Sequence, residues 1–178
     1  MDELTSLARA AGRGDHAALA GLIRATQTDV WRLCAHLADP GSADDLAQET
    51  YLRAIPALRG FRGDAPVRTW LLTIARRVCA GEIQARQRDR SLSASLAAGR
   101  RAQPGPDPGL RTELTMLIAA LDPDRCAAFV LTQLLGCSYA EAAAICGCPE
   151  GTIRSRVARA RTDLIAMIVE APRGATSA

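Results

Sequence analysis

Residues 138–161 read SYAEAAAICGCPEGTIRSRVARAR, and this stretch predicts two helices separated by a tight break. Ser138 and Glu141 have the spacing of a capping box, in which each side chain accepts a hydrogen bond from the other residue's backbone N–H. Gly147 suits the left-handed residue that ends a helix, and Pro149 suits the first turn of the next one. Signals in this order predict a helix-turn-helix.

The second of these two helices has two chemically different faces. At 100° per residue, Ile153, Val157, Ala160 and Leu164 fall on one side. The residues that point away from this apolar stripe are Arg154, Ser155, Ala158, Arg161 and Thr162, with Arg159 at their edge and Arg156 flanking the stripe. An exposed basic second helix is typical of a helix-turn-helix that enters the DNA major groove. The alternative is that the arginines form a solvated surface without a binding role. Their charge alone favours this alternative, but the order of the capping box, the glycine and the proline favours a helix-turn-helix.

The composition indicates a helical protein. The 178 residues suffice for one domain or two small ones. Hydrophobic residues make up 48% of the chain but aromatic residues only 3%, so the core must consist of Ala, Leu, Ile and Val, which favours packed helices. With no strand pattern or repeat, we predict an all-α fold of two small helical domains joined by a flexible linker, the C-terminal one containing the helix-turn-helix.

Capping residues, prolines and glycines give the expected boundaries of the helices. The first half predicts helices over 2–12, 16–38 (capped by Asp15), 43–59 (capped by Ser42, with Pro56 kinking or shortening its end) and 67–88. The second half predicts helices over 111–121 and 123–136 (capped by Asp122), followed by the helix-turn-helix, whose last helix reaches about residue 169. Residues 89–111 contain three prolines and three glycines, so we place the domains at 1–90 and 111–178 with a linker over 91–110.

Several classes of function have no supporting motif. The six cysteines form no C-x-x-C pair, and there are two histidines, so we expect no metal site. No Gly-rich phosphate loop or nucleophile motif is present, so we expect neither a cofactor nor catalysis. No apolar run approaches the roughly 18–20 residues that span a bilayer, and the N-terminus lacks a signal peptide, which predicts a reduced cytoplasmic protein. Binding to DNA through the helix-turn-helix would associate it with the nucleoid. A redox role for Cys146 and Cys148, which flank the break, stays open.

Two clusters in the first half are candidate interaction sites. Asp44, Asp45, Gln48 and Glu49 begin the helix over 43–59, where they either compensate the helix dipole or form an acidic docking surface. Phe61 and Arg62 lie in a loop before a helix that carries Arg76 and Arg77, an arrangement that can hold unstacked single-stranded bases. Phe61 is equally well explained as a residue that packs into the core. Trp70 lies on the apolar side of the helix over 67–88, so a place in the core explains it better than a contact with bases.

Three blocks resemble conserved regions of one bacterial family, the extracytoplasmic-function (ECF) sigma factors of the sigma-70 family. ADDLAQETYLRA at 43–54 resembles region 2.2, FRGD at 61–64 with TWLLTIAR at 69–76 resembles the start of regions 2.3–2.4, and 139–161 resembles region 4.2. The blocks occur in the family's order and spacing. The chain departs from relatives at Arg77 and Gly81, where they often have Asn and Asp.

The resemblance implies a sigma factor that binds core RNA polymerase and directs promoter-specific initiation, and not an enzyme. A stand-alone helix-turn-helix regulator is the competing hypothesis. The implied polymerase contacts are the β′ coiled coil and the β subunit, with Asp44, Asp45, Gln48 and Glu49 docking on the former. The implied contacts to the −35 element of promoter DNA are Arg154, Ser155, Arg156, Ala158, Arg159 and Arg161. Those to the −10 element are Phe61, Arg62, Arg76 and Arg77. An anti-sigma factor is a further partner common in the family.

Overall fold

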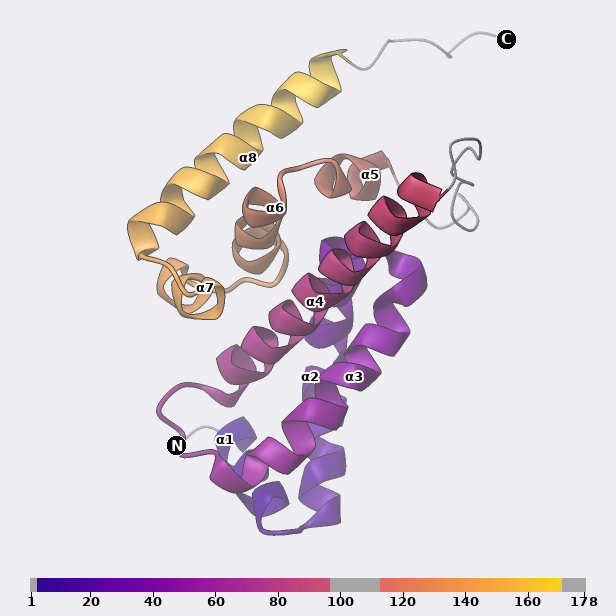
Figure 1. The fold of residues 1–178 in the computed structure, drawn as a ribbon. Coiled ribbons are helices and arrows are strands. Elements are labelled where there is room, and N and C mark those ends of the chain that lie inside the picture. The colour runs from indigo at the N-terminus through magenta and orange to yellow at the C-terminus, as the bar shows by residue number, and fades with distance from the viewer. Residues whose placement is uncertain (1–2, 97–112, 171–178) are drawn as a thin grey trace, which may run out of the picture. The chain divides into compact units, whose positions relative to one another are not determined.

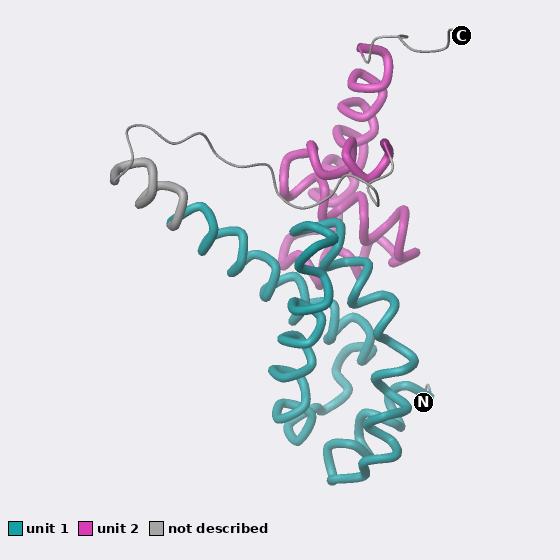
Figure 2. Tube along the Cα trace, turned by 90° about the vertical axis from the view of Figure 1, so that its right-hand side faces the viewer, with its two compact units in different colours: residues 1–110 teal, residues 111–178 magenta. Residues whose placement is uncertain are grey.

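The computed structural model describes residues 3–96, with side chains as far as Arg88, and residues 113–170. The chain divides into two compact units, residues 1–110 and 111–178 (Figure 2). Both described stretches consist of helices and turns and contain no strand. The predicted all-α fold of two small helical units is therefore confirmed.

The described residues of unit 1 form a bundle of four helices, whose arrangement is drawn in Figure 1. They are α1 (Glu3–Gly12), α2 (His16–Leu37), α3 (Ala43–Ala57) and α4 (Val67–Leu96), with 3-10 turns η1 (Pro40–Ser42) before α3 and η2 (Leu58–Gly60) after it. Helices α2, α3 and α4 pack on one another, and α1 packs on α2 and η2. A buried cluster joins them, made of Ala8, Leu22, Ala54, Leu58, Val67 and Leu71. The predicted cap of α2 is present, since the Asp15 carboxylate accepts a hydrogen bond from the N–H of Ala18 at 2.9 Å.

Helix α1 approaches η2 at a glycine. A Cβ at Gly12 would lie 2.5 Å from the backbone carbonyl oxygen of Leu58, well inside van der Waals contact. Only glycine allows the backbone to come this close without displacing either segment. Gly12 therefore sets how α1 packs on the bundle.

Two predictions for unit 1 are wrong in detail. Ser42 precedes α3 but its side chain makes no capping hydrogen bond, because its hydroxyl donates instead to the Asp39 carboxylate at 2.7 Å. The helix predicted to end near Arg88 continues to Leu96 as α4, since no glycine or proline lies between Arg88 and Gly99. The predicted linker thus begins inside a helix, and its residues from 97 onward lie outside the described part. Pro56 was predicted to kink or shorten the end of the helix over 43–59, and α3 does end early, at Ala57.

Residues 113–170, the described part of unit 2, form four α-helices and a π-helical turn. They are α5 (Glu113–Ala119), α6 (Pro123–Phe129), the π-turn η4 (Val130–Leu134), α7 (Tyr139–Cys146) and α8 (Glu150–Glu170). Helix α8 packs against α5, α6 and α7. Both hydrogen bonds of the Ser138–Glu141 capping box are present, and Gly147 is left-handed with a φ of +66°. The predicted helix-turn-helix is therefore confirmed as α7, a tight turn and α8.

The single helix predicted over 123–136 is interrupted. Asp122 caps α6 as expected, but the N–H of Leu135 bonds to the carbonyl of Val130, five residues back, at 3.0 Å. In a regular α-helix Leu134 would lie beside Val130 and Leu131. In the wider turn Val130, Leu131 and Leu135 are buried while Leu134 is 37% exposed.

Among the helices of residues 3–96 and 113–170, none has both the length and the apolar character that a membrane span requires.

Candidate DNA and protein interfaces

Helix α8 separates buried apolar residues from exposed polar ones, as predicted. Ile153, Val157, Ala160 and Leu164 are buried against the rest of unit 2. The exposed residues include Arg154, Ser155, Ala158, Arg159 and Arg161, which are the predicted contacts to the −35 element apart from Arg156. The Arg161 guanidinium also donates to the amide oxygen of Gln133 at 2.8 Å. The structure thus brings five of the six predicted −35 contacts onto the exposed side of one helix.

Arg156 does not join this exposed surface. Its guanidinium pairs with the Asp124 carboxylate of α6 and donates to the Cys148 sulfur at 3.5 Å. The side chain is only 22% exposed. A second ion pair, between Arg125 and Asp163 at 2.6 Å, also joins α6 to α8. Arg156 therefore holds α8 in place on α6.

Arg154 is held on the surface by two neighbours. Its Nη2 atom donates to the Glu150 carboxylate at 2.6 Å, one turn earlier on α8. Its guanidinium lies over the ring of Tyr139, 5.5 Å from the centroid. The hydrogen bond to Glu150 raises the pKa of Arg154 above its ordinary value. Arg154 is thus a fully charged donor group with a preferred direction.

The four predicted docking residues lie together at the start of α3. Asp44, Asp45 and Gln48 are exposed, and Glu49 is half-buried. The Asp44 carboxylate accepts a hydrogen bond from the indole N–H of Trp31 at 2.8 Å, and Glu49 pairs with Arg53 at 2.6 Å. Because Asp44 and Asp45 occupy the first turn, they also compensate the helix dipole, so the two sequence-based explanations are compatible.

A groove between α2 and α3 lies beside these acids. Its volume is about 410 Å³, and it is lined by Ile23, Gln27, Thr28, Trp31, Asp44, Ala47, Gln48 and Tyr51. The Trp31 side chain is 41% exposed, which is unusual for so large an apolar group. The α2 residues of this groove were not predicted from the sequence. The available signal was Trp31 itself, which is one of only two tryptophans in the sequence.

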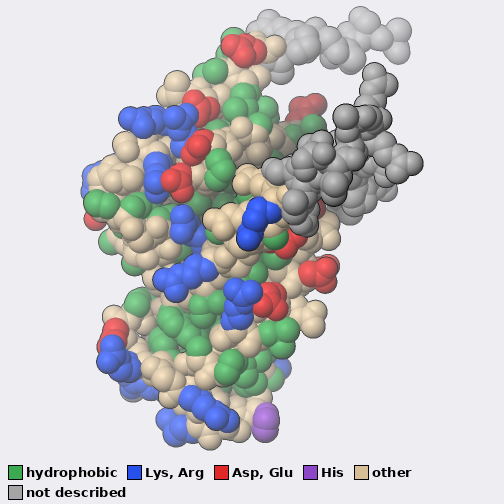
Figure 3. Space-filling model, viewed as in Figure 1, with side chains coloured by type: hydrophobic (Ala, Val, Ile, Leu, Met, Phe, Trp, Pro, Cys, Tyr) green, Lys and Arg blue, Asp and Glu red, His purple; other side chains and the backbone are tan. Residues whose placement is uncertain are grey.

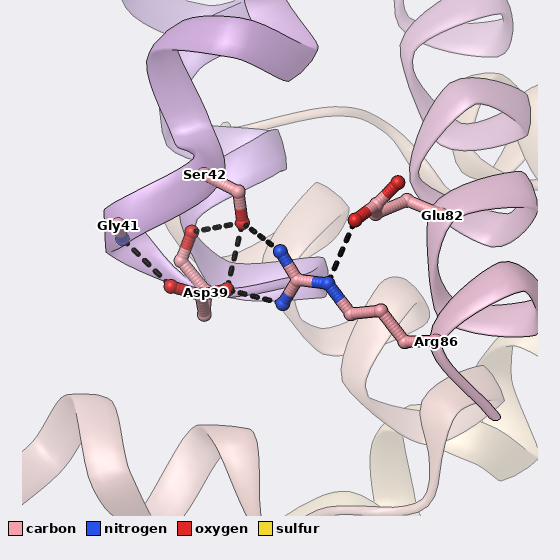
Figure 4. Close-up of polar contacts among 5 residues, drawn as sticks. All are labelled: Asp39, Gly41, Ser42, Glu82 and Arg86. Atoms are coloured by element: carbon pink, nitrogen blue, oxygen red, sulfur yellow. Dashed lines mark hydrogen bonds and ion pairs between the residues drawn. The ribbon is translucent and has the colours of Figure 1, made fainter. Parts of the chain in front are cut away.

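An arginine of α4 fixes the turn that leads into the docking helix. Figure 4 shows the Arg86 guanidinium among Asp39, Ser42 and Glu82. Arg86 is 2.6 Å from the Asp39 carboxylate, 3.0 Å from the Ser42 hydroxyl and 2.7 Å from Glu82. Burial alone would raise the pKa of Asp39, but hydrogen bonds from Ser42, Arg86 and the Gly41 N–H outweigh it and hold that pKa below its ordinary value. Arg86 therefore anchors η1, directly before Asp44 and Asp45.

The predicted −10 residues are only partly accessible. Phe61 is half-buried, its ring centroid lies 5.3 Å from that of Trp70, and both rings pack against the core of unit 1. Arg62 is 83% exposed and pairs with Asp64 at 3.1 Å. Arg77 is exposed and Arg76 is half-buried. The core role expected of Trp70 is thus seen, and Phe61 shares it.

The basic side of α4 is less positive than its sequence indicates. Arg68 pairs with Asp29 of α2 at 2.6 Å, and Arg86 is occupied by Asp39 and Glu82. Figure 3 accordingly shows acidic side chains among the arginines on the surfaces of the two units. Among Arg68, Arg76, Arg77 and Arg86 of α4, Arg77 is exposed to solvent and the other three are half-buried.

The cysteines are free thiols. Cys34, Cys79, Cys126 and Cys137 are buried, as the sequence predicted. Burial raises the pKa of Cys126 to about 12. The hydrogen bond between Cys34 and Cys79 lowers the pKa of Cys34 and raises that of Cys79. In the described residues no group of three His, Cys, Asp or Glu side chains is placed to hold a metal ion.

Comparisons with known proteins identify the family. Residues 22–89 match the model "Sigma-70 region 2", and residues 111–164 match "Sigma-70, region 4". The ECF RNA polymerase sigma factor SigC of Mycobacterium tuberculosis is 51% identical over 170 residues, which cover 93% of this chain and 91% of the relative. The chain belongs to the ECF sigma factors of the sigma-70 family.

Further relatives agree with this assignment. The ECF RNA polymerase sigma factor EcfG of Rhodopseudomonas palustris is 39% identical over 128 residues, or 71% of each chain. A co-crystal structure of the sigma factor RpoE with the anti-sigma factor NepR from Bartonella quintana is 26% identical with a TM-score of 0.71, covering 86% of this chain and 98% of that one. This sigma factor therefore directs promoter-specific transcription. A stand-alone regulator is not favoured, since it does not explain the region 2 match.

Proposed function

We propose that unit 2 of this sigma factor reads the −35 element as duplex DNA through the exposed side of α8. The observation that supports this proposal most directly is that Arg154, Ser155, Ala158 and Arg159 are exposed while the apolar stripe of the same helix is buried. An arginine bidentate to guanine contributes about 1–3 kcal/mol of discrimination against the wrong base. Arg161 contacts phosphate, and Arg156 contributes by holding α8 on α6.

Unit 1 docks on core RNA polymerase through the start of α3. The proposal is supported by exposed Asp45 and Gln48 beside the groove between α2 and α3, which offers acids and the apolar ring of Trp31 together. Such a surface is complementary to a helix that carries basic and apolar side chains, and the resemblance to region 2.2 implies that its partner is the polymerase β′ coiled coil. Asp44 belongs to this surface through its bond to Trp31, and Glu49 through its position one turn further along α3.

The loop before α4 and the exposed side of α4 hold the −10 element. Phe61 anchors this loop on Trp70, which leaves Arg62 exposed for backbone contacts. Arg76 and Arg77 lie further along α4, where cations are expected to follow a single-stranded phosphate backbone. Base capture costs a few kcal/mol of unstacking, which contacts in this part of unit 1 must offset.

An anti-sigma factor regulates the protein by covering its polymerase-docking surface. The support is the Bartonella quintana RpoE structure, a sigma factor of similar fold in complex with the anti-sigma factor NepR. An exposed groove with an aromatic rim is also the type of surface that a regulatory partner covers.

The docking proposal is tested by reversing one charge. Asp45→Lys should weaken binding of the full chain to bacterial core polymerase about tenfold, because an exposed acid becomes a repulsive base. Glu3→Lys is the matched control, since Glu3 is an exposed acid in the first turn of α1 and its reversal has the same effect on a helix dipole. A titration of labelled protein with core polymerase measures both. Equal affinities for Asp45→Lys and wild type would refute the docking surface.

A further inference from the structure

Glu150 is the one acid among residues 150–161, in a helix segment that carries four arginines. It is the first residue of α8, and its carboxylate pairs with Nη2 of Arg154 at 2.6 Å. An acid beside a surface that binds DNA repels phosphates, so its presence there weakens binding to any sequence. The structure thus contains a residue that opposes the general affinity of the surface around it.

We propose that Glu150 determines promoter specificity by holding Arg154 toward the base edges and by weakening contacts of α8 with DNA of the wrong sequence. This inference rests on the proposed reading of the −35 element by Arg154. Glu150 is a positioning residue in this role, since it acts through the guanidinium of its neighbour.

The geometry leaves Arg154 able to bind a base while it is held. A guanidinium has five N–H donors in a planar fork, and Glu150 accepts from Nη2, so donors remain for a base. The Tyr139 ring lies 5.5 Å from the guanidinium and restricts it from a second side. A side chain already restricted loses less conformational entropy on binding, so bidentate contact with guanine O6 and N7 is favoured.

The charge of the pair supplies the discrimination. A lone arginine on this surface would bind phosphates at any sequence. Paired with Glu150, Arg154 forms a neutral unit that gains little from phosphates and gains hydrogen bonds at a matching base. The carboxylate therefore lowers affinity on every sequence, and contact between Arg154 and its base offsets the loss at the correct site.

The competing explanation is that Glu150 only stabilises α8. Acids in a first turn interact favourably with the helix dipole, and pairs spaced i,i+4 stabilise helices slightly. Both effects would be lost in Glu150→Gln without any change in sequence preference. Glu113→Gln provides the matched control, because Glu113 is an exposed acid in the first turn of α5.

The test uses the full chain with bacterial core polymerase on a promoter library in which the −35 element is randomised. Arg154→Ala should abolish base preference at one position. Glu150→Gln should reduce preference at that same position about fivefold, part of the discrimination expected of one bidentate contact. It should also increase initiation from scrambled −35 templates and steepen the salt dependence of DNA binding by about one charge. Glu113→Gln should match the wild type in all three measurements.

Two outcomes would overturn the inference, and they are distinguishable. If Glu150→Gln keeps the wild-type preference while Arg154→Ala loses it, Glu150 only stabilises the helix and the proposed −35 reading stands. If Arg154→Ala also keeps the preference, Arg154 does not read the element, and both proposals fail. Thermal unfolding of each variant shows that the comparison is made between folded proteins.

Discussion

Arg154 and Arg156 stand two residues apart on α8, so their side chains leave the helix about 200° apart. Arg154 points to solvent and is restrained by Glu150 and Tyr139, whereas Arg156 points inward to Asp124. Two identical side chains in one short basic segment therefore have different surroundings, and we expect their partners, rather than their charge, to decide what each one does.

Replacing Arg156 should lower the stability of the protein, because its side chain joins α8 to α6 and does not face the proposed DNA surface. We expect Arg156→Ala to lower the free energy of unfolding by about 1 kcal/mol, because the Asp124 pair is partly exposed. Asp124→Asn should cost a similar amount, and the double variant less than the sum. Arg159→Ala, on the exposed side of the same helix, should stay within about 0.5 kcal/mol of the wild type. Urea unfolding measures all four, and an unchanged stability of Arg156→Ala would contradict the assignment.

The Asp39 carboxylate gives unit 1 a defined response to acid. Its pKa is held below the ordinary value of 3.8, so the folded state binds this proton less readily than the unfolded state. The resulting stabilisation is fully present above pH 3.8 and is lost as the pH falls through the lower folded value. We expect Asp39→Asn to be less stable than the wild type at pH 7, with the difference shrinking as the pH falls below 3.8. A stability difference that does not depend on pH would rule out this coupling.

At the scale of elements, two glycines in unit 1 provide opposite predictions. Gly12→Ala should destabilise the protein by about 1–3 kcal/mol, because its Cβ would collide with the backbone of η2, which cannot yield as a side chain would. Gly81→Ala should stabilise it by about 0.5–1 kcal/mol, since Gly81 lies within α4 and its Cβ would meet no described atom within 4 Å. Thermal unfolding of both variants is the measurement. A stabilised Gly12→Ala would show that α1 does not pack on η2 as described.

Elements defined by local signals could be predicted from the sequence, and those defined by distant partners could not. The caps at Asp15, Asp122 and Ser138 and the break at Gly147 depend on residues within a few positions, and all of them are present. The hydroxyl of Ser42 was diverted by Asp39 and Arg86, and Arg86 lies 44 residues away in the sequence. The π-turn η4 depends on how Val130 and Leu131 fit a core formed by other helices.

The candidate sites follow the same division. The exposed side of α8 and the acids of α3 could be predicted, because each belongs to a single helix with a regular period. The groove could not, since its lining comes from α2 and α3, and their spacing depends on tertiary packing. For the same reason the positive charge of α4 is lower than its own sequence indicates. Asp29 and Asp39, which belong to neighbouring segments, pair with its arginines.

At the scale of the whole molecule, the two units correspond to two different family regions. Region 2 matches residues 22–89 and region 4 matches residues 111–164, so each match lies within one unit. We therefore expect neither unit alone to direct initiation, because one carries the proposed docking and −10 surfaces and the other the −35 surface. The central claim is that both surfaces act on one promoter.

Transcription from a promoter library tests this claim most directly. Purified bacterial core polymerase is mixed with the full chain and a library in which both the −35 and −10 regions are randomised, and the transcribed templates are sequenced. We predict initiation that depends on the added protein, with preferred bases in both elements at one fixed spacing. If the protein instead binds duplex DNA without polymerase and no initiation depends on it, two-surface promoter reading is contradicted.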